Sequence, residues 1–269
     1  MRRFSLIFGL CLGLCLTLVP LAGADEWSKT FTISGKPNLR VETSDANIRV
    51  DTWDQHTIAA RVTTERWKIG ENGIKISARQ SGDTVELEVR FPNNVNFWGF
   101  NSGSRKVEIE IQMPREGRVS LHTGDGSVRL RNFKGETEIH SGDGSQELEA
   151  LDGALRAKAG DGHIRAAGRF DVLEIGTGDG RIEAHAIPGS QTASNWDLHA
   201  GDGSITLQVP ANFAAGVELR TEDGHISTNV PLASEGRSEQ NSVRGRLNGG
   251  GNLLSIHTGD GAIRLESLR

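Results

Sequence analysis

The stretch VSLHTGDGSVRLRNFKGETEIHSGDGSQELEALDGALRAKAGDGHIRAAG (residues 119–168) decides the fold, because one tripeptide returns in it at a fixed interval. Gly-Asp-Gly stands at 124–126, 142–144, 160–162, 178–180, 201–203 and 259–261. The first three steps are 18 residues each. A variant, Glu222-Asp223-Gly224, and a degenerate copy at 43–48 extend the series to eight. A fixed period of this kind indicates a repeat architecture.

Apolar residues flank every copy at fixed distances. The residue four places before the Asp is apolar in all eight copies, and the residue three places after it is apolar in seven, Gln146 being the exception. Polar residues fill the positions between. This alternation on both sides of a Gly/Asp turn predicts strand–turn–strand units.

The predicted fold is all-β, a right-handed parallel β-solenoid (a β-helix or β-roll) with coils of about 18 residues. Each repeat divides into two nine-residue halves, and each half holds one strand and one turn. Coils would stack about 4.8 Å apart. The right hand follows the general preference of parallel crossovers. A meander of antiparallel hairpins is the alternative. No segment after the leader predicts a helix.

Three segments organise the chain. Residues 1–24 resemble a signal peptide, with a basic start, an apolar run and cleavage expected after Ala24, so we expect a periplasmic or secreted protein. Residues 25–118 predict an N-terminal β-rich cap that includes the first degenerate repeat. Residues 119–269 carry the solenoid repeats, with inserts at 187–194 and at 231–251.

Composition excludes several classes of protein. The formal net charge is −5, and it becomes −7 without the leader, which holds two arginines and no acid, so a nucleic-acid partner is not expected. No second long apolar run predicts a membrane span. Both cysteines, Cys11 and Cys15, lie in the leader, so the rest of the chain has no disulfide. We expect no cofactor.

The sequence resembles the bacterial putative-adhesin family of β-strand-repeat proteins of unknown function. The resemblance is carried by LRVETSDANIRVDTW (39–53), LHTGDGSVRL (121–130) and RLNGGGNLLSIHTGDGAIRL (246–265), and it covers about residues 30–269. It implies a parallel β-solenoid outside the cytoplasm, a loose binding role and no established catalytic residues. The chain departs from the family in its histidines beside the turns and in an aromatic segment at 91–100.

The repeated Asp and His positions are candidate metal ligands. Stacked coils would align Asp125, Asp143, Asp161 and Asp179, whose oxygens suit Ca²⁺, or which could accept hydrogen bonds from their own turns. His122 and His140 would fall on adjacent coils and could share Zn²⁺ or Cu²⁺, respond to pH, or be ordinary exposed residues.

The segment FPNNVNFWGF (91–100) is the candidate partner-binding site. Its four aromatic residues stand among Asn and Gly without strand alternation. Such a segment could dock a partner, a sugar or a membrane surface, or it could fold over the open end of the solenoid. The candidate residues are Phe91, Phe97, Trp98 and Phe100.

The predicted function is a non-enzymatic, exported, adhesin-like binding or scaffold protein of the cell envelope. Its partner would be an envelope protein or a glycan, and its oligomeric state is left open. One alternative is an extracytoplasmic metal-binding protein that uses the repeated Asp and His residues. A second is a polysaccharide-active β-helix enzyme, although no Ser-His-Asp, phosphate-loop or HExxH pattern occurs.

Overall fold

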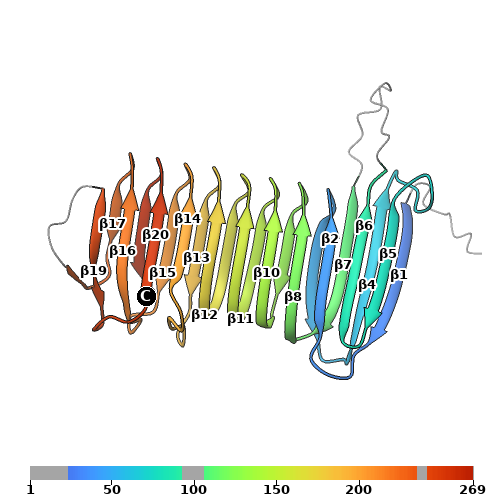
Figure 1. Ribbon diagram of the computed structural model, residues 1–269, viewed down its shortest axis with the longest axis horizontal. Coiled ribbons are helices and arrows are strands. Elements are labelled where there is room, and N and C mark those ends of the chain that lie inside the picture. The colour runs from blue at the N-terminus through green and yellow to red at the C-terminus, as the bar shows by residue number, and fades with distance from the viewer. Residues whose placement is uncertain (1–23, 93–105, 235–240, 269) are drawn as a thin grey trace, which may run out of the picture.

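The computed structural model describes residues 24–92, 106–234 and 241–268, and these form one continuous sheet of 21 strands folded into two layers (Figure 1). The described residues contain no helix, so the all-β prediction is confirmed. In particular, none of them forms a helix able to cross a membrane. The predicted leader, 1–24, lies outside this part of the chain except for its last residue.

The first layer, sheet A, runs from one end of the molecule to the other. In spatial order its strands are β5 (Lys75–Ser81), β6 (Thr84–Arg90), β2 (Asn38–Thr43), β8 (Glu116–Thr123), β10 (Lys134–Ser141), the second half of β11 (Gln146–Ala159), the second half of β12 (Ile164–Thr177), β14 (Trp196–Ala200), β20 (Leu253–Thr258), β16 (Ala215–Thr221), β19 (Ser242–Leu247) and β18 (Leu232–Ser234).

The second layer, sheet B, takes the other strand of each coil. Its order is β1 (Ala24–Thr32), β4 (Thr57–Glu65), β7 (Val107–Pro114), β3 (Asn47–Trp53), β9 (Val128–Arg131), the first halves of β11 and β12, β13 (Ile182–Ala186), β15 (Ile205–Val209), β21 (Ile263–Ser267) and β17 (Ile226–Thr228). The long strands β11 and β12 run through both layers.

Neighbouring coils in the middle of the molecule pair in parallel with the predicted 18-residue offset. Thr137 of β10 lies opposite Val119 of β8 on one side and Leu155 of β11 on the other. The predicted apolar positions are the buried ones, as Leu121 and Ile164 illustrate. Gln146 is buried among them, and its amide nitrogen donates to Ser141 Oγ (2.9 Å) and to the Lys158 carbonyl (2.7 Å).

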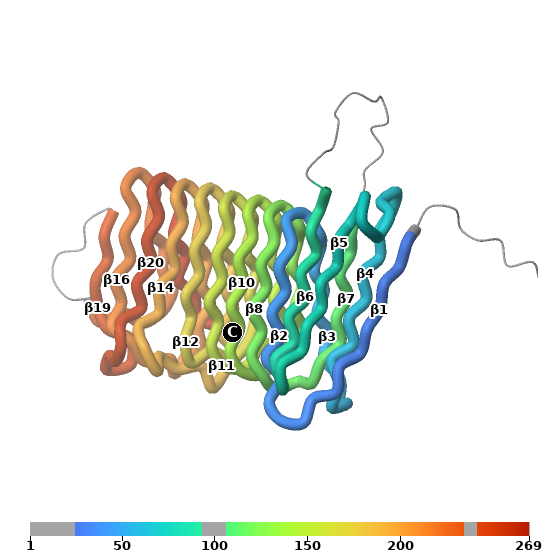
Figure 2. Tube along the Cα trace, turned by 45° about the vertical axis from the view of Figure 1, so that its right-hand side comes forward, coloured from blue at the N-terminus to red at the C-terminus, as the bar shows by residue number. Residues whose placement is uncertain are grey.

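The order of coils in space departs from their order in sequence at both ends. The last coil of the chain, β20 and β21, lies between the coil of β14 and β15 and the coil of β16 and β17 (Figures 1 and 2). In the same way β2 and β3 lie between β8 and β9 on one side and β6 and β7 on the other. Each end of the stack therefore holds a coil supplied from a distance in sequence.

Antiparallel strands close the N-terminal end. Strand β1 pairs with β4, and β5 pairs with β6, so that both layers end in an antiparallel edge. Lys29 Nζ donates to the Ala78 carbonyl (3.5 Å), and Gln80 Nε2 donates to the Thr32 carbonyl (2.7 Å). These side chains link the two edge strands and occupy carbonyls that would otherwise be free to recruit another strand. The predicted boundary between cap and solenoid at residue 118 stays a prediction. The sheet itself is continuous there, because β2 pairs with β8.

Candidate functional site

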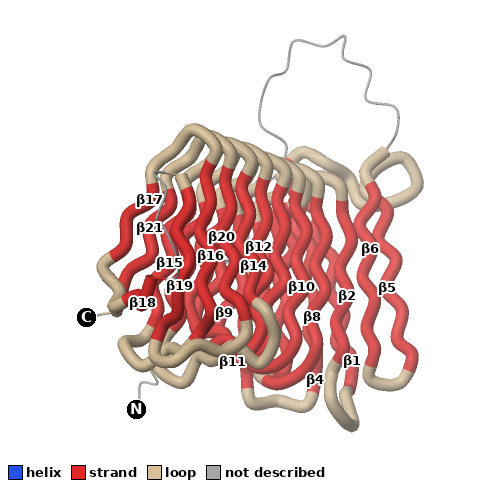
Figure 3. The backbone as a smooth tube through the Cα atoms, turned by 60° about the vertical axis from the view of Figure 1, so that its left-hand side comes forward, coloured by secondary structure: helices blue, strands red, loops and turns tan. Residues whose placement is uncertain are grey.

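The Gly-Asp-Gly turns form a row along one edge of the stack (Figure 3). The turns of neighbouring coils pack closely against one another. The first glycines hydrogen-bond from coil to coil, as in Gly259 N to Gly201 O (2.6 Å). A methyl group on the second glycine of a turn, such as Gly203, would lie 1.7 Å from the Gly180 carbonyl oxygen. Both glycines are therefore needed for the coils to approach each other.

A column of buried hydroxyls supports these turns from inside, a feature that the repeat pattern did not predict. Thr258, two residues before its Asp, donates through Oγ1 to the Gly203 carbonyl at 2.7 Å. Thr177 donates in the same way to the Gly162 carbonyl (3.0 Å), and Thr221 to the Gly261 carbonyl (3.0 Å). The signal in the sequence is a Thr or Ser directly before four of the six Gly-Asp-Gly copies, with Ala159 and Ala200 before the other two. These bonds satisfy turn carbonyls that are shielded from water.

The Asp side chains stand exposed at the tips of the turns. Between successive Gly-Asp-Gly turns, a carboxylate oxygen of the Asp lies close to the first glycine of the next turn; for Asp202 it would be 3.3 Å from a methyl group at Gly259. Among the residues that the structure describes, no three His, Asp or Glu side chains are placed to hold one ion. Calcium binding by Asp125, Asp143, Asp161 and Asp179 stays a prediction.

The histidines that precede the turns lie side by side on sheet A. His122 and His140 are in register on β8 and β10, with ring centroids 6.2 Å apart and planes tilted by 40°. His140 Nε2 is 3.3 Å from Glu138 Oε1. A second pair, His199 and His257, stacks at 5.4 Å with planes 9° apart. The sequence could not reveal this second pair because β14 and β20 pair at an offset of 58 residues instead of the 18-residue step.

Several charged side chains on the two outer surfaces are paired from coil to coil. Five ion pairs join residues exactly one coil apart in sequence: Arg118–Glu136, Lys134–Glu116, Arg129–Glu147, Arg156–Glu174 and Arg165–Glu183. Each pair is exposed and contributes only a fraction of a kcal/mol. These pairs neutralise part of the outer surface, and charged groups without a partner are available to a ligand.

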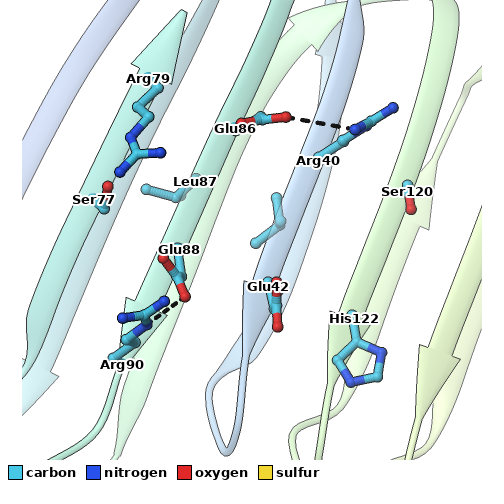
Figure 4. Close-up of a pocket in the computed structure, with 11 residues that line it drawn as sticks. Arg40, Glu42, Ser77, Arg79, Glu86, Leu87, Glu88, Arg90, Ser120 and His122 are labelled. Carbon is cyan, nitrogen blue, oxygen red and sulfur yellow. Dashed lines mark hydrogen bonds and ion pairs between the residues drawn. The ribbon is translucent and has the colours of Figure 1, made fainter.

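A groove of about 420 Å³ near the N-terminal end is lined by paired and unpaired charged groups (Figure 4). It crosses β5, β6, β2 and β8, and three arginines and three glutamates line it. Arg40 pairs with Glu86 (3.5 Å), and Arg90 pairs with Glu88. Arg79 and Glu42 have no partner among the described residues. The groove therefore offers a free guanidinium and a free carboxylate.

The aromatic segment begins at the rim of this groove, where β6 ends. Phe91 directly follows Arg90 and is half-buried, with its ring edge-on to Trp67 at a centroid distance of 6.0 Å. Trp67 was not a predicted site residue, although it stands just beyond the alternating pattern of β4. Phe97, Trp98 and Phe100 lie outside the described residues. Of the four predicted aromatics, the structure thus places Phe91 in a packed position.

One ion-pair cluster is more buried than the rest. Arg169 donates to both carboxylate oxygens of Asp171 (2.6 and 2.8 Å) and also contacts Asp152. Hydrogen bonding to Arg169 holds the pKa of Asp171 below its usual range, against the opposing effect of burial. The same hydrogen bonds raise the pKa of Arg169. The cluster fixes the chain next to the predicted insert at 187–194.

We expect Asp171→Asn to lower the free energy of unfolding by about 1 kcal/mol at pH 7. A carboxyl whose pKa is depressed in the folded state stabilises the protein above the unfolded pKa, about 3.9, and that stabilisation disappears as the pH falls through the lower folded value. Urea unfolding at pH 7 and pH 2.5 measures the difference. If the variant and the wild type differ in free energy of unfolding by the same amount at pH 7 and at pH 2.5, the stabilising role of the Asp171 carboxylate is wrong.

Comparison with known proteins gives a family match and several similar structures. A family model described as Toastrack DUF4097 matches residues 116–266. No curated protein matches the chain. Similar solved structures include a "putative cell adhesion protein" from Clostridium sporogenes (15% identity, TM-score 0.43, covering 91% of this chain and 100% of that one). Others are a "putative lipid binding protein" from Parabacteroides distasonis (15%, 0.45, 90% and 96%) and a "putative adhesin" from Bacteroides fragilis (11%, 0.33, 91% and 97%).

Proposed function

We propose a function for this chain from the premise that it belongs to the Toastrack DUF4097 family, whose model covers more than half of its length. The chain is a non-enzymatic scaffold that is exported to the cell envelope and binds a partner protein or glycan there. The scaffold is a right-handed parallel solenoid, and export rests on the leader-like residues 1–24. The binding region lies at the N-terminal end.

The proposal rests on one observation: the charged groove and the aromatic segment are next to each other. Arg90 lines the charged groove, and the next residue, Phe91, opens the aromatic segment and packs on Trp67. A groove with unpaired Arg79 and Glu42 gives polar recognition, and aromatic side chains give apolar contact area, which is the usual composition of a binding surface. Sheets stiffened by coil-to-coil hydrogen bonds hold the groove in place without a ligand. The alternatives of metal binding through Asp and of polysaccharide cleavage stay predictions.

We expect the double variant Trp98→Ser, Phe100→Ser to release the exported protein from the envelope fraction into the soluble fraction. The serines would remove the apolar contact area while leaving the described strands unchanged. Cell fractionation with immunoblotting of a tagged chain measures the distribution. Arg79→Ala should give a smaller shift in the same direction, since it removes one polar contact.

The matched control is Ile187→Ser, which removes the exposed large hydrophobic side chain of the described residues (44% exposed) far from the groove. It should leave the distribution as in the wild type. If the aromatic variant stays in the envelope fraction, or if Ile187→Ser is released equally, the proposed binding region is wrong.

A further inference from the structure

We infer that the two histidine pairs of sheet A are binding sites for a divalent transition-metal cation, with Cu²⁺ bound more tightly than Zn²⁺. The site formed by the imidazoles of His199 and His257 is the stronger of the two, and the site formed by those of His122 and His140 is the weaker. The stronger site is independent of the proposed partner binding, because it lies on β14 and β20 and takes another ligand. The weaker site shares β8 and His122 with the charged groove.

The two sites share one arrangement of four side chains. In the first, Ser120-Leu-His122 of β8 lies in register with Glu138-Ile-His140 of β10. In the second, Asp197-Leu-His199 of β14 lies in register with Ser255-Ile-His257 of β20. Each site thus has an imidazole pair at one level and, two residues earlier on the same surface, an acid opposite a serine. The second arrangement exists only because β20 is inserted beside β14.

Neutral imidazole is a preferred ligand of Cu²⁺ and Zn²⁺, with metal–nitrogen bonds of about 2.0–2.1 Å. Two rings whose centroids are 5.4 Å apart can direct one nitrogen each to a shared ion after rotating out of their stack. His199 is exposed and His257 half-buried, so that rotation meets little resistance. The two imidazoles are the protein ligands, and water completes the coordination. The carboxylate two residues earlier adds negative charge near the ion, without being placed as a third ligand.

The surroundings favour the second site. Asp197 is exposed and has no partner among the described residues, whereas Glu138 is already engaged with His140. Beside His199 the neighbouring strand presents Gly176, where an added methyl group would meet only a Lys158 carbon at 4.0 Å. The space next to the ring is therefore open for an ion and its water ligands.

The charges around the second site suit a cation. Carboxylates flank it at Glu174 and Glu218 in the row of Asp197, and at Asp202 and Asp260 on the adjoining turns. The nearest bases are Lys158 and Arg220 in the histidine row, together with Arg156 and Arg244, which are paired to Glu174 and Glu218. Ca²⁺ would bind poorly, since it prefers oxygen ligands.

The test is a calorimetric titration of the metal-free chain 24–269 with CuSO₄, and separately with ZnCl₂ and CaCl₂. We expect two equivalents of Cu²⁺ for the wild type, weaker binding of Zn²⁺ and no binding of Ca²⁺. His199→Asn with His257→Asn should remove the tighter equivalent. His122→Asn with His140→Asn should remove the weaker one, and Asp197→Asn should weaken the tighter site without changing the stoichiometry.

The matched control is His56→Asn with His225→Asn, which removes two exposed histidines that stack on no other ring in the described part of the chain. It should keep both equivalents. All changed residues are on the surface, and circular dichroism checks that each variant folds. The inference fails if the wild type binds no Cu²⁺ or if the His199 and His257 variant keeps both equivalents of Cu²⁺. It also fails if the control variant loses as many equivalents of Cu²⁺ as the variants of the paired histidines.

Discussion

Replacing Gly203 by Ala is expected to lower the free energy of unfolding by about 3 kcal/mol or more, although it adds only one methyl group. That methyl group would lie 1.7 Å from the Gly180 carbonyl oxygen, so the turns of two coils must move apart. A shift of the Gly203 turn would also disturb its contact with the coil on the other side, where Thr258 donates to the Gly203 carbonyl. Because Gly203 does not have a positive φ, the cost is one of contact and not of backbone strain.

Gly176→Ala is the matched control, since the same methyl group there would meet only the Lys158 side chain at 4.0 Å. It should be neutral or stabilise the protein by up to about 1 kcal/mol through the unfolded state. Urea unfolding of the two variants measures both effects. Equal losses at Gly203 and Gly176 would show that the glycines of the turns are not there for close packing.

Removal of residues 252–269 is expected to detach the segment from Ala215 to Leu247 from the rest of the sheet, not merely to shorten the stack by one coil. Strands β20 and β21 are the parallel partners of β14 and β15 on one side and of β16 and β17 on the other. Without them, the strands that pair with β20 and β21 are left with unpaired edges in both layers. The buried side chains of Leu254, Ile256, Ile263 and Leu265 are lost at the same time. Exposed edges and apolar surface of this kind are not stable in water.

Limited proteolysis with mass spectrometry measures this effect. Cleavage should concentrate between 210 and 251 while residues 24–209 stay protected. A control chain that ends at Ser267 keeps the whole coil and should resist cleavage throughout. If the segment 215–247 stays protected in the longer truncation, the last coil does not lie between its two neighbours.

The regular part of the fold could be predicted because one physical rule governs it. Residues such as Leu121 and Ile164 alternate with polar ones, and the 18-residue step of the turns sets the parallel register. His122 and His140 were predicted as neighbours for this reason, and the structure places them in register. Thr258 and its equivalents were overlooked, since a polar residue next to a turn is commonly exposed, whereas these donate inward.

The ends of the stack could not be predicted from the repeat. Periodicity gives the distance between consecutive coils but not the order in which separate coils are inserted. The pairing of His199 with His257 and the groove that joins Arg79 to Glu42 both depend on inserted strands, β20 and β2. Trp67 was missed for a related reason, because it lies in a connection where alternation stops.

A disulfide test of strand order examines the structure most directly. Thr206 of β15 lies opposite Arg264 of β21, and Arg264 lies opposite Ser227 of β17. Neighbouring strands are about 4.8 Å apart, within the range that a disulfide spans, whereas Thr206 and Ser227 are about twice that distance apart. The chain from residue 24 onward has no other cysteine.

The measurement is the oxidation of two double variants of that chain, followed on non-reducing gels and by mass spectrometry. Thr206→Cys with Arg264→Cys should form the intramolecular disulfide nearly completely, and Thr206→Cys with Ser227→Cys should not form it. The reverse result would mean that the coils stack in the order of the sequence. It would contradict both the insertion of the last coil and the histidine site that this insertion creates.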